Sequence, residues 1–159
     1  MPSMVNVLKE YGVPYMVDPR YHLAANPTWD GKVLRVPNEP DKIVTWVMHE
    51  VSHHLVATPE GRKDPNYGLG SDPGGGATVR ATGNCRGDSP EEDEQAVCLL
   101  DLWLLKKHGF EGEIEHHARD YGISGYTPKD LAVCLEILNE AGLPGHEIVK
   151  HYKDVENPS

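Results

Sequence analysis

The chain has 159 residues, 38% of them hydrophobic and 25% charged, and its formal net charge is −10. This length and composition suit one globular domain. The acidic balance argues against nucleic acid as a partner, because binding to phosphates needs clustered Lys and Arg. It is compatible with a protein or peptide substrate, but it does not select one.

The three cysteines are Cys85, Cys98 and Cys134, and no two of them form a C-x-x-C pair. An odd number of distant cysteines predicts reduced thiols rather than a disulfide framework. The N-terminus lacks a basic region followed by a long apolar run, so we expect no signal peptide. With no apolar stretch of membrane-spanning length, we expect a cytoplasmic protein without a membrane partner.

The first part of the chain predicts one helix and a small sheet. The expected elements are a helix over 3–11, extended segments over 13–17 and 20–24, a turn over 26–31 and a strand over 32–36. Pro14 favours an edge position for its strand, and Asp30-Gly31 is a typical hairpin pair. We therefore expect a short antiparallel sheet, in which the strand over 32–36 accepts an extended substrate at its edge.

A strong amphipathic helix is predicted over residues 39–57. Asn38 and Asp41 have the spacing of a capping box, and Pro59 cannot continue the helix. The apolar positions recur at helical spacing; they are Ile43, Val44, Val47, Met48, Val51 and Leu55. This helix follows directly on the strand over 32–36.

Residues 58–90 are rich in Gly and Pro and predict a long loop, with one short strand over 77–82. Loops of this length inside a domain are usually functional, so we expect this loop to line or cover a cleft.

A second strong helix is predicted over 90–108. Ser89 and Glu92 suit a capping box, Pro90 suits the first helical position, and Gly109 ends the helix. Shorter helices are expected over 113–121, 127–142 and 145–153, followed by a frayed tail over 156–159.

The sequence His49-Glu50-Val51-Ser52-His53 lies within the first strong helix and has the pattern H-E-x-x-H. Residues four apart share one helix face, so both imidazoles can bind one metal ion. Glu50 is then placed to act as the general base on a water molecule. The sequence thus predicts a metal site with His49 and His53 as ligands and Glu50 as the catalytic residue.

A catalytic zinc usually has a third protein ligand. The position six residues after His53 is Pro59, which excludes the metzincin arrangement. The acids at 91–94 are the obvious source, and the ligand should have small or polar residues one and two turns further on. Glu94 meets this condition best, and Glu91 is the alternative.

The sequence gives less support for a role of other polar residues at the metal site. Asp101 could support a metal ligand from behind, and Tyr67 could stabilise a transition state if its loop folds over the metal. His54 points about 100° away from His53 on the helix and is expected to pack. Adjacent His116 and His117 diverge on a helix, so they are not expected to bind one ion together.

The residues His49, Glu50 and His53, after a short strand and before an acidic helix, resemble the minimal gluzincin-type metallopeptidases over residues 32–105. That resemblance implies a zincin-like fold, bound zinc and peptide hydrolysis. The usual E-x-x-A-N signature of the second helix is altered here, because Ala96 has Asp93 three residues before it and Val97 after it.

Residues 46–70 also resemble elongation factor P hydroxylase. The similarity continues from the H-E-x-x-H pattern through Arg62 to Asn66, Tyr67 and Gly68, whereas further Trp and Tyr positions of that family are absent. This resemblance implies the same metal-site architecture with Fe²⁺ and a hydroxylation reaction. Two His and one carboxylate also suit non-haem iron.

Together these features predict an α+β, zincin-like domain over residues 1–155, mainly helical, with a short antiparallel sheet before the H-E-x-x-H helix. The expected function is that of a metal-dependent hydrolase, a small zinc metallopeptidase. The alternatives are a metal-dependent protein hydroxylase and a non-catalytic binding module stabilised by its metal. The sequence does not indicate the oligomeric state.

Overall fold

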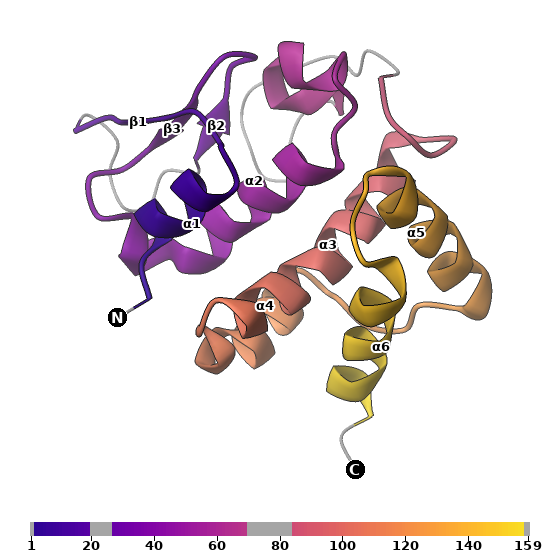
Figure 1. Ribbon diagram of the computed structural model, residues 1–159. Coiled ribbons are helices and arrows are strands. Elements are labelled where there is room, and N and C mark those ends of the chain that lie inside the picture. The colour runs from indigo at the N-terminus through magenta and orange to yellow at the C-terminus, as the bar shows by residue number, and fades with distance from the viewer. Residues whose placement is uncertain (1, 20–26, 70–83, 158–159) are drawn as a thin grey trace.

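The computed structural model describes residues 2–19, 27–69 and 84–157, and in these ranges it contains six α-helices and three short strands (Figure 1). This mixed and mainly helical architecture agrees with the expected α+β class. The extended segment expected over 20–24 and the strand expected over 77–82 lie outside the described residues.

The N-terminal part forms helix α1 (Met4–Glu10) and a sheet of β1 (Tyr15–Val17), β2 (Thr28–Trp29) and β3 (Leu34–Val36). The strand order is β1-β3-β2. β1 lies at an edge, as Pro14 predicted, but it pairs with β3 in parallel, so the expectation of a purely antiparallel sheet is wrong. Only β2 pairs with β3 in the antiparallel sense.

The position of β3 also changes the expected role of the strand over 32–36. β3 is the central strand and pairs on both sides, so it has no edge to offer to an extended substrate. The hairpin at Asp30-Gly31 is confirmed: Asp30 Oδ1 accepts from the backbone N–H of Lys32 at 2.8 Å and of Val33 at 2.9 Å. Sequence periodicity missed β2 because its two residues stand within strong turn chemistry.

Helix α2 (Val44–Val56) follows a short 3-10 turn, η1 (Pro40–Ile43), so the helix starts later than expected. The capping box of Asn38 and Asp41 is not formed. Asp41 Oδ1 instead accepts from the backbone N–H of Met4 at 2.7 Å and so caps α1. α2 ends because Ala57 adopts an extended backbone, with ψ of 146°.

Helix α3 (Pro90–Lys107) has ten buried residues among its eighteen. The Ser89 side chain makes no capping hydrogen bond, so the capping box expected there is wrong. Glu92 Oε1 accepts instead from the backbone N–H of Asp88, at 2.7 Å. Glu92, the acid expected in the capping box, thus stabilises the turn that precedes α3.

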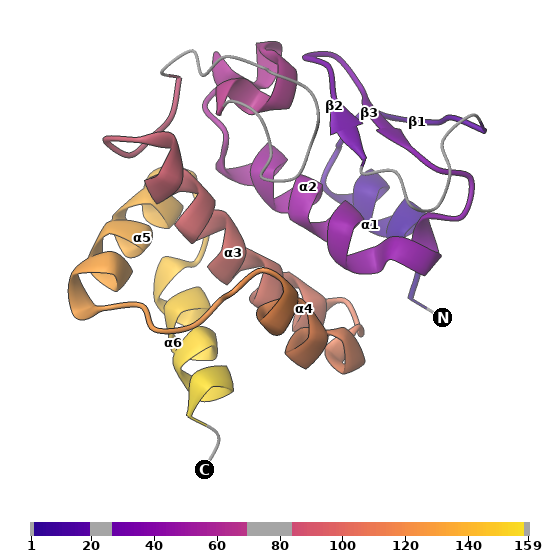
Figure 2. The ribbon, with the colours of Figure 1, turned by 180° about the vertical axis from the view of Figure 1, so that it is seen from behind.

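The C-terminal part consists of α4 (Ile114–Asp120), α5 (Pro128–Glu140) and α6 (Gly145–Glu156), close to the expected ranges. α6 extends to Glu156, the first residue of the tail that was expected to be frayed, and residues 158–159 lie outside the described residues. Figures 1 and 2 show α1 and the sheet on one side of α2, and α3 with α5 and α6 on the other side. α2 and α3 therefore lie side by side in the centre.

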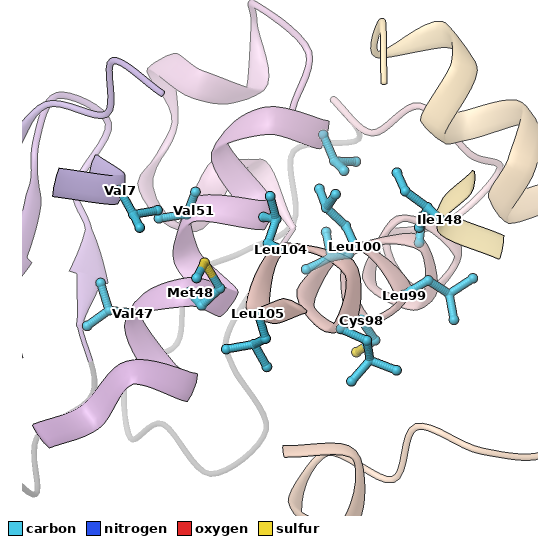
Figure 3. Packing of buried hydrophobic residues seen from close by; sticks show 14 of the residues in the cluster. Val7, Val47, Met48, Val51, Cys98, Leu99, Leu100, Leu104, Leu105 and Ile148 are labelled. Atoms are coloured by element: carbon cyan, nitrogen blue, oxygen red, sulfur yellow. The ribbon is translucent and has the colours of Figure 1, made fainter. Parts of the chain in front are cut away.

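The core is continuous across this central pair of helices. In Figure 3, Val7 of α1, Val51 of α2 and Leu104 of α3 lie in one row, and Met48 lies beside Leu105. All five side chains are at most 3% exposed and belong to one apolar cluster. Burial of this kind contributes roughly 25 cal/mol per Å² of apolar surface, so it fixes α2 against α3.

The chain after α2 was expected to be an unstructured loop, but its described part forms two short 3-10 turns, η2 (Gly61–Lys63) and η3 (Pro65–Gly68). The Trp29 indole N–H donates to the carbonyl of Arg62 at 3.0 Å, which ties η2 to the sheet. Trp29 also stacks on Tyr67 of η3, with ring centroids 4.9 Å apart.

Within the described ranges, none of the helices has the length and apolar character that a membrane crossing requires.

Gly31 offers a test of this attachment. Its φ is +98°, and a Cβ there would lie 2.6 Å from the carbonyl oxygen of Lys63 in η2. Gly12 also has positive φ, +65°, but a Cβ there meets nothing within 4 Å. We expect Gly12→Ala to destabilise by about 1–2 kcal/mol through backbone strain, and Gly31→Ala by about 1–3 kcal/mol more through the clash. Equal free energies of unfolding in urea would contradict the close approach of η2 to the hairpin.

Candidate metal centre

The imidazoles of His49 and His53 project from one face of α2 toward α3. Their Nε2 atoms are 3.2 Å apart. The Glu94 carboxylate of α3 lies against both, with Oε1 2.8 Å from His49 Nε2 and Oε2 2.9 Å from His53 Nε2. Three groups with metal-ligating atoms thus converge on one point between the two central helices.

The buried carboxylate of Asp101 contacts His49 on the side of the imidazole opposite to Nε2. Asp101 Oδ2 accepts from His49 Nδ1 at 2.7 Å and from His117 Nε2 of α4 at 2.8 Å. Asp101 and His117 have no exposed surface. Because His49 Nδ1 is held in this way, His49 Nε2 is the atom that faces Glu94 and His53.

Glu50 lies next to His49 on α2 and is only 4% exposed. Its charge acts to raise the pKa of both His53 and Tyr121. The Tyr121 ring packs 4.6 Å from that of His49 and 4.4 Å from that of His117, between centroids. A carboxylate buried beside His49 is a candidate for proton transfer at this cluster.

The electrostatics of the cluster follow from burial and opposite charge. Burial acts to lower the pKa of His49, but the charges of Asp101 and Glu94 outweigh it and raise this pKa well above its usual value. The pKa of His53 is raised against burial chiefly by Glu94. The two imidazoles in turn hold the pKa of the Glu94 carboxyl well below its usual value, although burial opposes this.

The four acids at 91–94 have four different positions. Glu91 is exposed, and Glu92 holds the turn before α3. Asp93 is buried and accepts from the backbone N–H groups of Arg86 and Gly87, at 2.9 and 2.7 Å. Glu94 is the acid that contacts the two imidazoles. The structure therefore places the favoured candidate for the third ligand, and not its alternative Glu91, beside His49 and His53.

Tyr67 is wholly buried, and its ring lies parallel to that of His53 at 5.8 Å between centroids. Its hydroxyl lies 3.5 Å from the carbonyl oxygen of Glu50 and from His54 Nδ1. These contacts hold α2 and the His54 ring in place; they do not direct the Tyr67 hydroxyl at the point where His49, His53 and Glu94 meet.

Sequence reasoning did not identify His117, Tyr121 or Arg86 as parts of the site. Arg86 Nε donates to the carbonyl of Val56 at 2.6 Å, which joins the end of α2 to the segment before α3. His117 and exposed His116 do diverge as expected, but His117 turns inward to Asp101. One available signal was the spacing of His117 and Tyr121, which are four residues apart and share a helix face.

Two further sets of side chains have ligand atoms within 4.8 Å of one another: His49 with Glu94 and Cys98, and His49 with Asp101 and His117. Both include His49, so they extend the same cluster. The Cys98 thiol donates to Glu94 Oε1 at 4.0 Å. Burial raises the pKa of Cys98 well above its usual value, with the charges of Glu94 and Asp101 acting in the same direction.

Comparison of the chain with known protein families, with curated proteins and with solved structures returned no match. The site is therefore interpreted from its own geometry.

The buried His54 gives a prediction for pH. Burial, with the nearby Arg62 charge, lowers the pKa of His54 to about 4, whereas an unfolded His has a pKa of about 6.5. Between about pH 6.5 and pH 4, His54 is protonated in the unfolded chain but neutral in the folded chain. The free energy of unfolding therefore decreases as the pH falls through this range. This loss is about 3 kcal/mol.

Replacement of His54 by Gln removes the titrating group, and we expect a flatter pH dependence over this window. Urea unfolding of chelator-treated protein at several pH values measures it. His116→Gln, at an exposed position, is the control and should keep the wild-type slope. An unchanged slope in His54→Gln would show that His54 protonates freely in the folded state.

Proposed function

We propose that this chain is a metal-dependent hydrolase, a small zinc metallopeptidase, in which His49, His53 and Glu94 hold the metal and Glu50 is the general base. The observation that supports it most is the convergence of the two Nε2 atoms and the Glu94 carboxylate between α2 and α3.

The donor set fits zinc. Two nitrogen atoms bound to one tetrahedral zinc at about 2.0–2.1 Å lie about 3.3 Å apart, and the two Nε2 atoms here are 3.2 Å apart. Two imidazoles and one carboxylate leave a fourth position for water or substrate, which is the pattern of catalytic zinc sites. When bound in such a site, zinc lowers the pKa of a water molecule and polarises a carbonyl group.

The side chains have distinct roles in this proposal. Glu50 accepts the proton of the attacking water and returns it to the leaving amine. Its position supports this role, because Glu50 is buried next to His49 on α2. Asp101 holds His49 in the tautomer whose Nε2 lone pair faces the cluster. The Tyr121 ring packs against the imidazoles of both His49 and His117.

One prediction of the proposed function concerns metal binding. We expect one Zn²⁺ per chain after purification or after addition of zinc to chelator-treated protein, measured by elemental analysis. His49→Ala, His53→Ala and Glu94→Ala should each lose the ion, whereas His146→Ala, outside the cluster, should keep it. Zinc should also raise the melting temperature of the wild type, since a ligand that binds only the folded state stabilises it.

Iron in place of zinc, together with oxygen-dependent activity, would contradict hydrolysis and favour the hydroxylase alternative. The absence of any stoichiometric divalent metal would contradict the metal centre itself.

The second prediction concerns Glu50. We expect Glu50→Gln to keep the zinc but to lose about 10²- to 10⁴-fold in kcat, the usual contribution of a general base. Cleavage of fluorogenic casein and of a mixed peptide library by the zinc-loaded protein measures this. Glu91→Gln, at the exposed start of α3, is the matched control.

Full activity of Glu50→Gln would exclude Glu50 as the base. No hydrolysis of either probe by the wild type, with zinc bound and Glu50→Gln indistinguishable from it, would favour the module that keeps its metal for stability.

A further inference from the structure

We infer that His117 is a positioning residue of the metal centre: its Nε2–H holds the Asp101 carboxylate, which in turn holds the His49 imidazole. His117 itself does not lie among the proposed ligands. It comes from α4, so this contact connects a third helix to the centre formed by α2 and α3.

The contacts form a chain of buried groups. Asp101 Oδ2 receives His49 Nδ1 at 2.7 Å and His117 Nε2 at 2.8 Å. The exposed fractions are 5% for His49 and zero for Asp101 and His117. The same carboxylate oxygen therefore accepts from both imidazoles, away from water.

The two hydrogen bonds define the tautomers. A carboxylate oxygen accepts, so both ring nitrogens that contact it carry protons. His49 Nε2 contacts the Glu94 carboxylate in the same way and donates to it in the metal-free chain. A metal ion that replaced this Nε2 proton would find the Nε2 lone pair facing His53 and Glu94, while the Nδ1 proton stays on Asp101. The outer partner of a metal-binding His commonly sets ring orientation and ligand basicity in this way; here that partner, Asp101, itself depends on a second imidazole.

His117 is needed because Asp101 is completely buried. A buried carboxylate that loses one of its two donors keeps only His49 as a partner, and the weaker compensation of its buried charge is unfavourable. It can then rotate or take up a proton, and either change releases His49 Nδ1. The Tyr121 ring, which packs on both imidazoles at 4.4 and 4.6 Å between centroids, keeps the His49 and His117 rings in register.

The same three residues also have ligand atoms close enough to hold a second metal ion. Their burial, with at most 5% of each residue exposed, and the short N···O distances favour hydrogen bonds over a second ion. This alternative predicts two zinc ions per chain, of which one is lost on replacement of His117.

The experiment compares His117→Leu, His117→Gln and His116→Leu. Gln keeps an N–H donor near the position of His Nε2, whereas Leu removes it. His116 is the neighbouring, exposed residue of α4 and serves as the matched control. Two quantities are measured: the affinity for Zn²⁺ alone, in competition with a chromophoric chelator, and the Nδ1–H resonance of His49 in ¹H–¹⁵N NMR, with and without zinc.

We expect His117→Leu to weaken zinc binding by about 10- to 100-fold, the usual cost of losing an outer partner, and to abolish the exchange-protected His49 Nδ1–H resonance. His117→Gln should retain the resonance and stay within about 3-fold of wild-type affinity, a smaller effect than the loss of the whole partner. His116→Leu should match the wild type in both measurements.

The inference is overturned if the His49 resonance survives in His117→Leu, if His117→Gln loses as much affinity as the loss of an outer partner would cost, or if two zinc ions bind per wild-type chain. Should His117→Leu fail to fold, His117→Gln still decides, since the inference requires near-normal affinity and an intact resonance. The affinity readout rests on the proposed metal function, but the NMR readout on zinc-free protein does not. A wild type that binds no zinc and yet shows the protected resonance would count against the function alone.

Discussion

The contact of the Glu94 carboxylate with the imidazoles of His49 and His53 fixes how α2 and α3 must lie. Both carboxylate oxygens are used, one for each Nε2 atom, at 2.8 and 2.9 Å. A shift of α3 by one residue would rotate Glu94 by about 100° away from α2. The rest of the fold is arranged so that this register is kept.

Two kinds of interaction keep it. Met48 and Val51 of α2 belong to one apolar cluster with Leu104 and Leu105, which lie about three turns along α3 from Glu94. Arg86 acts at the near end, where its side chain donates to the last carbonyls of α2 while its backbone N–H donates to Asp93 of α3. The centre is thus fixed from both sides.

The buried charges impose a second constraint. Glu50, Asp101 and the three imidazoles around them lie in the interior of a chain that is already acidic, and burial of unpaired charge is strongly unfavourable. The structure meets this constraint by giving Asp101 two donors and placing Glu94 between two more. A divalent cation at this point would neutralise the same negative charge, which supports the proposed metal centre.

Much of this arrangement could be predicted from the sequence. Helical periodicity and the H-E-x-x-H spacing predicted α2 with its two imidazoles on one face. The small and polar residues that follow Glu94 at helical spacing, Cys98 and Asp101, predicted which acid faces α2. These predictions worked because they depend on contacts within one helix or between two strongly periodic helices.

The remainder depends on distant contacts that periodicity does not encode. The parallel pairing of β1 with β3 joins segments separated by a turn and by residues outside the described ranges, and each strand has three residues. The local patterns at Ser89 and at Asn38 suggested capping boxes, but the two acids have other partners. Glu92 accepts from the neighbouring backbone N–H of Asp88, and Asp41 accepts from the distant backbone N–H of Met4. His117 reaches the centre only because α4 folds back on α3. The spacing of His117 and Tyr121 places them on one helix face, but it does not indicate which helix that face contacts.

The most direct test of the central claim is X-ray absorption spectroscopy at the zinc edge of the stoichiometrically loaded protein. Coordination by His49, His53 and Glu94 predicts two imidazole nitrogens at about 2.0–2.1 Å, oxygen ligands at about 2.0–2.2 Å and no sulfur. In Glu94→Gln the carboxylate contribution should change while the imidazole scattering persists. A sulfur shell at about 2.3 Å, which would indicate Cys98, or a spectrum without imidazole scattering, would contradict the proposed centre.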